Sequence, residues 1–86
     1  MKTIVKLYTR NKCHLCENAK AILLSLKDKW DFQYIEADID KSDELTEKYG
    51  LMIPVVEIDG EEVQFGQIDE VFLEETLTRK KASLLS

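Results

Sequence analysis

Two cysteines three residues apart are the residues of this chain most able to do chemistry. Cys13 and Cys16 are the only cysteines among its 86 residues. They follow an apolar run over residues 3–8 and precede an amphipathic run that begins at Glu17. This order predicts a junction between a strand and a helix, with Cys13 at the helix N-terminus and Cys16 one turn inside. Such a pair can carry out thiol–disulfide exchange, supply half of a zinc or iron–sulfur site, or simply lie in the core.

Composition and charge exclude several other classes of function. The formal net charge is −5, and an acidic chain lacks the basic surface that nucleic-acid binding requires. No apolar run approaches the roughly 18 residues of a membrane span, and Met1 leads directly into a strand pattern without an export signal. We therefore expect a cytoplasmic protein that binds neither nucleic acid nor membrane. In a reducing compartment a CxxC pair is more often catalytic or metal-binding than a structural crosslink.

The charge is distributed unevenly along the chain. Residues 1–30 carry seven Lys/Arg and two Asp/Glu, a net charge of +5, whereas residues 31–86 carry five Lys/Arg and fifteen Asp/Glu, a net charge of −10. Arg10 and Lys12 belong to the basic part and directly precede the cysteines. Two interpretations remain open for them. They stabilise a cysteine thiolate, or they form a solvated surface as most charged residues do.

The elements that must position the cysteines follow from the apolar pattern. Residues 4–8 predict a buried strand, and the apolar spacing from Cys16 to Trp30 predicts a helix over 17–29 whose buried stripe is widened by Leu15 and Leu24. The remaining expected elements are a strand over 32–39, a helix from about 41 or 42 to 49, a strand opened by Pro54 and running to 58, a strand running to Phe65, and a last helix marked by Ile68, Val71, Phe72 and Leu77.

Two turns and the C-terminal tail are predicted in more detail. Gly50 follows the second helix, where a left-handed C-terminal cap is expected. Asp59-Gly60 predicts a two-residue hairpin turn, in which Val56 pairs with Val63 on the facing strand. Residues 82–86 are expected to fray.

The order of these elements defines the expected fold. It is β-α-β-α-β-β-α within one domain that spans residues 1–86. A strand–helix–strand unit implies that the first two strands are parallel, with a right-handed crossover, whereas the hairpin adds antiparallel strands. We expect an α/β protein with three layers around a mixed four-stranded sheet.

Three segments make this chain resemble the glutaredoxin family of the thioredoxin-fold superfamily, over nearly its whole length. Residues 8–16, Tyr-Thr-Arg-Asn-Lys-Cys-His-Leu-Cys, are similar to the family's Y-[ST]-K-x-x-C-P-Y-C segment. Residues 52–56 are similar to its T-V-P-x-V segment, and residues 65–70 to its G-G-x-D-D segment. The resemblance implies a thioredoxin-like fold, a disulfide-exchange activity and a cis peptide bond before Pro54.

Four residues depart from the family pattern. His14 and Leu15 replace Pro and Tyr between the cysteines, a change that is expected to tune the redox chemistry. Met52 stands where Thr is usual, and Gln67 replaces the second glycine, which in the family lets glutathione approach the backbone. The departures indicate a glutaredoxin-like subgroup with a CHLC pair rather than a standard glutathione-dependent enzyme.

Cys13 is the candidate nucleophile and Cys16 the candidate resolving thiol. Only a thiolate attacks a disulfide, and a free cysteine with a pKa of ~8.5 is about 3% ionised at pH 7. Lowering that pKa to ~6 requires roughly 3.4 kcal/mol in favour of the anion, of which the helix dipole typically supplies ~0.3–1 kcal/mol. The remainder is expected from the backbone N–H groups of Leu15 and Cys16 and from a nearby cation.

Further residues are candidates for substrate contacts. His14 either stabilises the thiolate when protonated or shapes partner contacts as an exposed side chain. Ile53, beside Pro54, offers backbone N–H and C=O groups for pairing with an extended substrate. Gly66 and Asp69 begin the last helix, where Asp69 either helps to hold a carboxylate at the helix N-terminus or is a simple N-cap. The full set of expected substrate-contacting residues is Arg10, Lys12, His14, Ile53, Pro54, Gly66 and Asp69.

The sequence therefore predicts a thiol–disulfide oxidoreductase that cycles between a dithiol and a Cys13–Cys16 disulfide. Its substrate is expected to be a protein disulfide or a glutathione mixed disulfide, and its electron donor glutathione or a thioredoxin-reductase-like enzyme. We expect a monomer without a bound cofactor or metal. The alternative is a non-enzymatic redox sensor or a metal-binding module, in which the cysteine pair forms half of a site shared between two chains.

Overall fold

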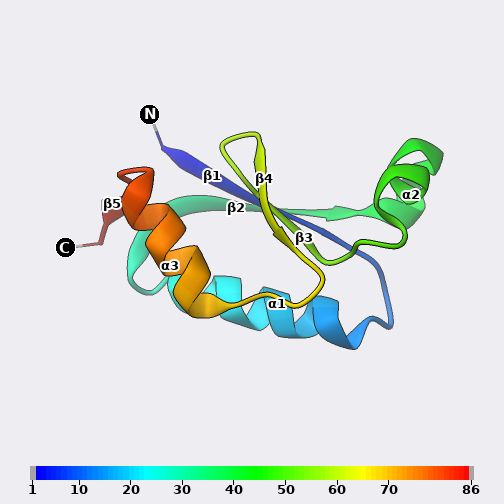
Figure 1. Cartoon of the computed structure of the whole chain (residues 1–86), viewed down its shortest axis with the longest axis horizontal. Coiled ribbons are helices and arrows are strands. Elements are labelled where there is room, and N and C mark those ends of the chain that lie inside the picture. The colour runs from blue at the N-terminus through cyan, green and yellow to red at the C-terminus, as the bar shows by residue number, and fades with distance from the viewer. Residues whose placement is uncertain (1, 86) are drawn as a thin grey trace.

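A mixed five-stranded sheet in the order β4-β3-β1-β2-β5 runs through the computed structural model of this chain, which describes residues 2–85. The elements in chain order are β1 (Thr3–Thr9), α1 (His14–Leu26), β2 (Trp30–Asp38), the 3-10 turn η1 (Ile39–Lys41), α2 (Asp43–Tyr49), β3 (Val55–Ile58), β4 (Glu61–Phe65), α3 (Glu70–Arg79) and β5 (Ser83–Leu84) (Figure 1). The predicted α/β order is confirmed, with one strand more than expected. Within residues 2–85, no helix has the length and apolar character needed to cross a membrane.

Strand β1 lies at the centre of the sheet and determines where the cysteine loop emerges. It is parallel to β2, with Thr9 opposite Asp38, and antiparallel to β3, with Tyr8 opposite Val55. The last residues of β1 and β2 and the first residue of β3 therefore lie at the same end of the sheet. The loop that carries the cysteines leaves β1 at this end, between the turn after β2 and the loop before β3.

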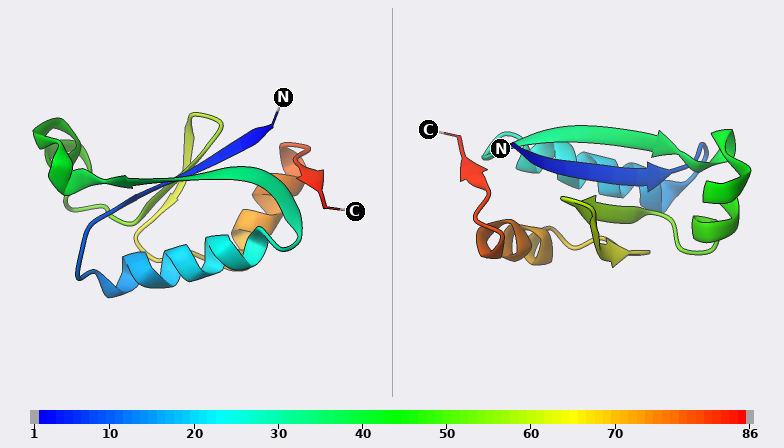
Figure 2. Two further views of the ribbon diagram at one scale, coloured as in Figure 1. Left: turned by 180° about the vertical axis from the view of Figure 1, so that it is seen from behind. Right: turned by 90° about the horizontal axis from the view of Figure 1, so that it is seen from above.

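The two faces of the sheet are covered differently. Helices α1 and α3 both pack on one face, below the sheet in Figure 1, and enclose the larger core cluster. Helix α2 stands at the end of the sheet where β1 and β2 finish (Figure 2). There it covers a smaller cluster on the other face, in which the Tyr8 and Tyr49 rings stack with centroids 4.4 Å apart. The larger cluster consists of Val5, Leu7, Ala19, Leu23, Leu26, Trp30, Phe32, Val56, Ile58, Leu73 and Leu77.

The fifth strand corrects the prediction that residues 82–86 fray, as far as residue 85; Ser86 lies outside the described residues. Ser83 and Leu84 pair antiparallel with Asp31 and Trp30 at the edge of β2, and the Leu85 N–H donates to the Lys29 carbonyl at 2.9 Å. Backbone groups make this pairing, so a two-residue strand leaves no apolar alternation in the sequence by which to find it.

Helix α1 starts and ends three residues earlier than predicted, and it buries a narrower stripe. It ends at Leu26, and Trp30, expected as the last apolar residue of the helix, is the first residue of β2. Leu15 and Leu24 were expected to widen the stripe, but their side chains are 47% and 44% exposed. A helix that packs on a sheet along one line buries residues three and four apart, and both leucines lie beside that line.

Gly50 does not form the predicted left-handed cap. Its φ of −55° is right-handed, and α2 continues into a turn in which the Met52 and Ile53 N–H groups both donate to the Tyr49 carbonyl. Glycine is needed here for space, because a Cβ on Gly50 would lie 2.6 Å from the carbonyl oxygen of Thr46.

The hairpin turn is confirmed, but its register is not. Asp59 and Gly60 both have positive φ, as a two-residue turn requires. Val56 pairs with Gln64 rather than with Val63, because a β-bulge shifts the register between Val56 and Glu57. The extra residue in β4, Val63, packs against the larger core cluster.

The last helix begins where it was predicted and buries a partly different set of residues. Asp69 precedes α3 as its N-cap. Val71, expected to mark the apolar face, is exposed. Leu73 and Thr76, which the prediction omitted, are buried together with Leu77.

Candidate active site

The cysteine pair lies at the N-terminus of α1, as predicted. Cys13 is the N-cap residue with extended backbone angles, and its carbonyl accepts the first helical hydrogen bond from the Glu17 N–H at 3.0 Å. A disulfide joins Cys13 to Cys16 in the first helical turn, with a Cα–Cα distance of 5.2 Å. The Cys16 N–H donates to the Cys13 Sγ at 3.2 Å. The sulfur therefore occupies the position that a capping oxygen takes at other helices.

The two sulfur-bearing residues differ in accessibility. Cys13 is half-buried, whereas Cys16 is only 2% exposed. An outside disulfide therefore has readier access to Cys13, the residue expected to attack, than to Cys16, the residue expected to resolve. Two small hollows adjoin the pair. One of about 190 Å³ reaches Cys16, and one of about 160 Å³ is lined by Lys12, Cys13, His14 and Glu17.

The turn before the cysteines brings two of the predicted residues to the site. Lys12 has a φ of 58°, so a left-handed residue turns the chain from β1 into the helix. Lys12 lines both hollows beside the disulfide. His14, the first residue of α1, is exposed and lines the smaller hollow.

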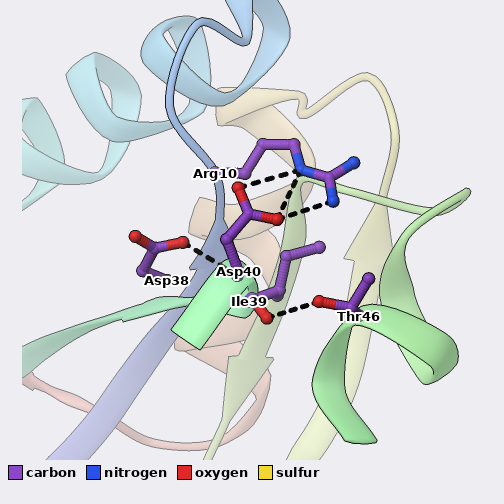
Figure 3. A network of polar contacts seen from close by, with 5 residues as sticks. All are labelled: Arg10, Asp38, Ile39, Asp40 and Thr46. Atoms are coloured by element: carbon purple, nitrogen blue, oxygen red, sulfur yellow. Dashed lines mark hydrogen bonds and ion pairs between the residues drawn. The ribbon is translucent and has the colours of Figure 1, made fainter. Parts of the chain in front are cut away.

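Arg10 forms an ion pair that the sequence did not predict. Its Nη2 and Nε donate to Oδ1 of Asp40 at 2.7 and 3.2 Å, and Nε is 3.4 Å from Oδ2 (Figure 3). The hydrogen-bonded Asp40 carboxylate raises the pKa of the Arg10 guanidinium above its ordinary value. One of the two cations considered as support for the Cys13 thiolate is thus paired with an acid from the turn η1.

Acidic residues at the end of β2 are the part of the site that sequence reasoning missed. Glu36 accepts a hydrogen bond from the Tyr34 hydroxyl at 2.8 Å and pairs with Lys20 of α1 at 3.3 Å. The Tyr34 hydroxyl, followed by Lys20, lowers the pKa of Glu36 below its ordinary value. The signal was present in the sequence. Glu36, Asp38 and Asp40 alternate at the end of a strand predicted to be parallel to the one before the cysteines.

The loop before β3 lies beside the cysteine loop through the pairing of β1 with β3. The Ile53–Pro54 peptide bond is cis, as the resemblance implied. The Ile53 N–H, expected to be available to a substrate, instead donates to the Tyr49 carbonyl at 3.1 Å. The structure shows no hydrogen bond from residues 2–85 to the Ile53 carbonyl. Only one of the two backbone groups predicted for substrate pairing is therefore free.

Gly66 ties the segment before α3 to this loop, and Asp69 caps the helix that follows. The Gly66 N–H donates to the Pro54 and Met52 carbonyls at 2.8 and 3.1 Å, with Gly66 at a left-handed φ of 78°. Asp69 has the N-cap role, because its Oδ1 accepts from the Val71 N–H at 3.1 Å. Its own N–H donates to Oε1 of Gln64 at 2.9 Å. No group of three or more His, Cys, Asp or Glu side chains within residues 2–85 is arranged to hold a metal ion.

Comparisons with known proteins agree with this fold. Residues 4–78 match the family model of a glutaredoxin-like domain (DUF836). The crystal structure of a structural-genomics target from X. campestris is 29% identical, with a TM-score of 0.74 over 87% of this chain and 96% of that one. A protein from Nitrosomonas europaea, solved by NMR, is 28% identical, with a TM-score of 0.72 over 88% of this chain and 92% of that one. A mutant thioredoxin from Halobacterium salinarum is 21% identical, with a TM-score of 0.71 over 99% of this chain and 78% of that one, and shares the fold.

Proposed function

We propose that this chain, which belongs to the glutaredoxin-like domain family, is an enzyme that exchanges electrons with disulfides through its two cysteines. One observation carries the proposal. A half-buried Cys13 caps a helix and is bonded to a buried Cys16 whose N–H already points at its sulfur. A thioredoxin fold with a CxxC disulfide at a helix N-terminus fits redox chemistry, because the helix end favours the charged form of the outer sulfur.

The exchange proceeds in two balanced steps. In the dithiol form, the Cys13 thiolate attacks one sulfur of the target disulfide, and the other target sulfur leaves as a thiolate that takes up a proton. Cys16 loses its proton and attacks the Cys13 sulfur, which closes the intramolecular disulfide and releases the second target thiol. Two electrons pass to the target. We propose that two thiols from glutathione, or a thioredoxin-reductase-like enzyme, return them.

The target in this proposal is a protein disulfide, or a glutathione mixed disulfide on a protein. The free Ile53 carbonyl, beside the cysteine loop, supports binding of an extended segment that donates one backbone N–H to it. The N–H of Ile53 is already used, so the contact is a single hydrogen bond rather than a strand-like pair. We propose that the protein acts as a monomer, without a bound cofactor, in a reducing compartment such as the cytoplasm, where thiols are abundant.

Substitution of each cysteine tests the proposal. Cys13→Ser removes the nucleophile, so reduction of a disulfide-bonded protein substrate is expected to fall to the background rate. Cys16→Ser leaves the nucleophile without its resolving partner, so a mixed disulfide with the substrate is expected to accumulate, visible by mass spectrometry and released by dithiothreitol. Asn18→Ser, an exposed change in the same helix, is the matched control and retains activity. Full activity of the Cys13→Ser protein would reject the proposed function.

A further inference from the structure

The charges around the redox pair cancel once the chain is folded. The hollow that reaches Cys16 is lined by the cations Arg10, Lys12 and Lys20 and by the carboxylates Glu17, Glu36 and Asp38. Two of these cations are already in ion pairs, Arg10 with Asp40 at 2.7 Å and Lys20 with Glu36 at 3.3 Å. Of the three, only Lys12 has no ion-pair partner within residues 2–85. Most of the basic excess of residues 1–30 at this hollow is therefore paired with carboxylates, and among the described residues Lys12 is the cation that remains unpaired there.

Further hydrogen bonds hold the Asp40 side of the Arg10–Asp40 ion pair in place. Figure 3 shows both oxygens of the Asp40 carboxylate directed at the Arg10 guanidinium. The backbone of Asp40 is fixed, because its N–H donates to Oδ1 of Asp38 at 2.9 Å. Asp38 is the N-cap of η1. The same turn is fixed to α2 by a hydrogen bond of 2.6 Å from the Thr46 hydroxyl to the Ile39 carbonyl. Asp40 thus meets Arg10 from an ordered turn.

An arginine fork is the side chain best suited to bind a carboxylate from solution. Arg10 lines the hollow beside the cysteines, three residues before Cys13, so an unpaired Arg10 would attract small disulfides that carry carboxylates. Asp40 already fills the fork and is tethered to the same chain. A ligand carboxylate must displace a partner whose effective concentration is far higher than its own.

We propose that Asp40 is a specificity-determining residue, which pairs with Arg10 and thereby disfavours small anionic disulfides relative to neutral disulfides and protein disulfides. The inference rests on the proposed disulfide exchange and leaves its chemistry unchanged. Cys13 attacks and Cys16 resolves with every substrate. What Asp40 alters is how strongly a negatively charged substrate is attracted to the rim of the site.

The test follows single-turnover oxidation of the dithiol protein by three small disulfides, which requires no reductase. Glutathione disulfide is anionic, 2-hydroxyethyl disulfide is neutral, and cystamine is cationic. In Asp40→Asn the rate ratio of glutathione disulfide to the neutral disulfide is expected to rise about 5-fold at low salt, the factor for one unit charge about 4 Å away in water. The ratio of cystamine to the neutral disulfide is expected to fall. Both changes should shrink at about 1 M salt, where the Debye length is about 3 Å.

Three further variants separate the effect of the ion pair from that of charge in general. The double variant Arg10→Gln/Asp40→Asn is expected to lose the gain, because no guanidinium is left to be released. Asp43→Asn removes an exposed carboxylate three residues further along, in the first turn of α2, and is expected to change the ratio less than 2-fold. If Asp40→Asn does not fold, the swapped pair Arg10→Asp/Asp40→Arg keeps the contact and should show a ratio close to that of the unaltered protein.

The outcomes distinguish this inference from the proposed function. An equal acceleration with all three disulfides would show that Asp40 acts on the geometry of the site, and an unchanged ratio would show that Arg10 does not attract anions. Either result overturns the specificity role while exchange itself continues. If the unaltered dithiol protein reacts with none of the three disulfides, the proposed function fails instead.

Discussion

Helices α1 and α3 begin in nearly the same way, and only one of them begins with a reactive atom. Cys13 has φ −119° and ψ 108°, and Asp69 has φ −114° and ψ 120°. Each N-cap side chain accepts one hydrogen bond from a backbone N–H. The N···S distance at Cys13 is 3.2 Å, and the N···O distance at Asp69 is 3.1 Å. Each N-cap carbonyl accepts the first helical hydrogen bond, at 3.0 and 3.1 Å.

The difference lies in what the capping atom can become. The Asp69 carboxylate is a strong acceptor that holds the helix end in one state. The Cys13 sulfur is a weak acceptor in the thiol form, a stronger one as a thiolate, and a covalent link when bonded to Cys16. The same local backbone therefore stabilises structure at α3 and leaves the helix end responsive to redox state at α1.

Exchanging the two capping chemistries should produce the largest effect. Cys13→Asp keeps a good N-cap but removes the proposed nucleophile, so disulfide exchange is expected to fall to background while α1 stays folded. Asp69→Ala removes a cap but no reacting atom, so exchange should persist within about 3-fold. Activity assays with circular dichroism of both variants check this. Residual exchange in Cys13→Asp would mean that the reacting sulfur had been misassigned.

The left-handed residue before α3 should give the next largest effect. Gly66 has a φ of 78°, and a Cβ there would meet no atom within 4 Å. The penalty of Gly66→Ala is therefore conformational, about 1–2 kcal/mol of unfolding free energy. Gly66→Asn, which tolerates this conformation better, should lose less. Urea unfolding of the two variants measures the difference, and equal losses would point to the hydrogen bonds of Gly66 rather than to its φ.

The two caps should also differ in their contribution to stability. Asp69→Ala is expected to lower the unfolding free energy by about 1 kcal/mol, the usual value for losing an N-cap oxygen. Cys13→Ala, compared under reducing conditions, should lower it less, because a thiol is a weaker acceptor. Urea unfolding followed by the fluorescence of Trp30, the single tryptophan, provides the measurement. A larger loss of unfolding free energy in Cys13→Ala than in Asp69→Ala would show that the Cys13 thiol is the stronger cap.

The smallest expected effect is on the acid stability of the fold. It comes from two carboxylates in ion pairs, Glu36 with Lys20 of α1 and Glu74 of α3 with Lys29. The Tyr34 hydroxyl, followed by Lys20 of α1, lowers the pKa of Glu36, and Lys29 lowers that of Glu74 in α3. A carboxyl whose pKa is lower in the folded state stabilises the fold above its unfolded pKa and loses this contribution as pH falls through the folded pKa. Stability should therefore decline below about pH 4.5. Glu36→Gln and Glu74→Gln should each flatten the decline, as acid titrations in urea would record.

Features that depend on a few neighbouring residues were predicted correctly. Asp69 as an N-cap, the Asp59-Gly60 turn and the strand–helix junction at Cys13 depend on a few neighbouring residues, whose preferences decide the backbone. The order of elements followed from apolar spacing, and the pairing of the first two strands from the crossover rule.

Features that depend on distant parts of the chain were missed. The partner of Arg10 lies thirty residues away, so the sequence around Cys13 did not predict the ion pair with Asp40. The bulge at Val63 follows from packing against the core, and the role of Gly50 from the approach of the Thr46 carbonyl. Neither packing against the core nor a close backbone approach leaves a periodic signal.

The short strand β5 has a consequence for handling the protein. An edge strand offers unpaired N–H and C=O groups that can recruit another chain and start aggregation. The backbone of Ser83 and Leu84 covers the outer edge of β2 at Trp30 and Asp31. Trimming the chain after Ala82, or fusing a bulky tag there, would uncover that edge. We therefore expect aggregation during storage to increase when this segment, remote from the cysteines, is removed.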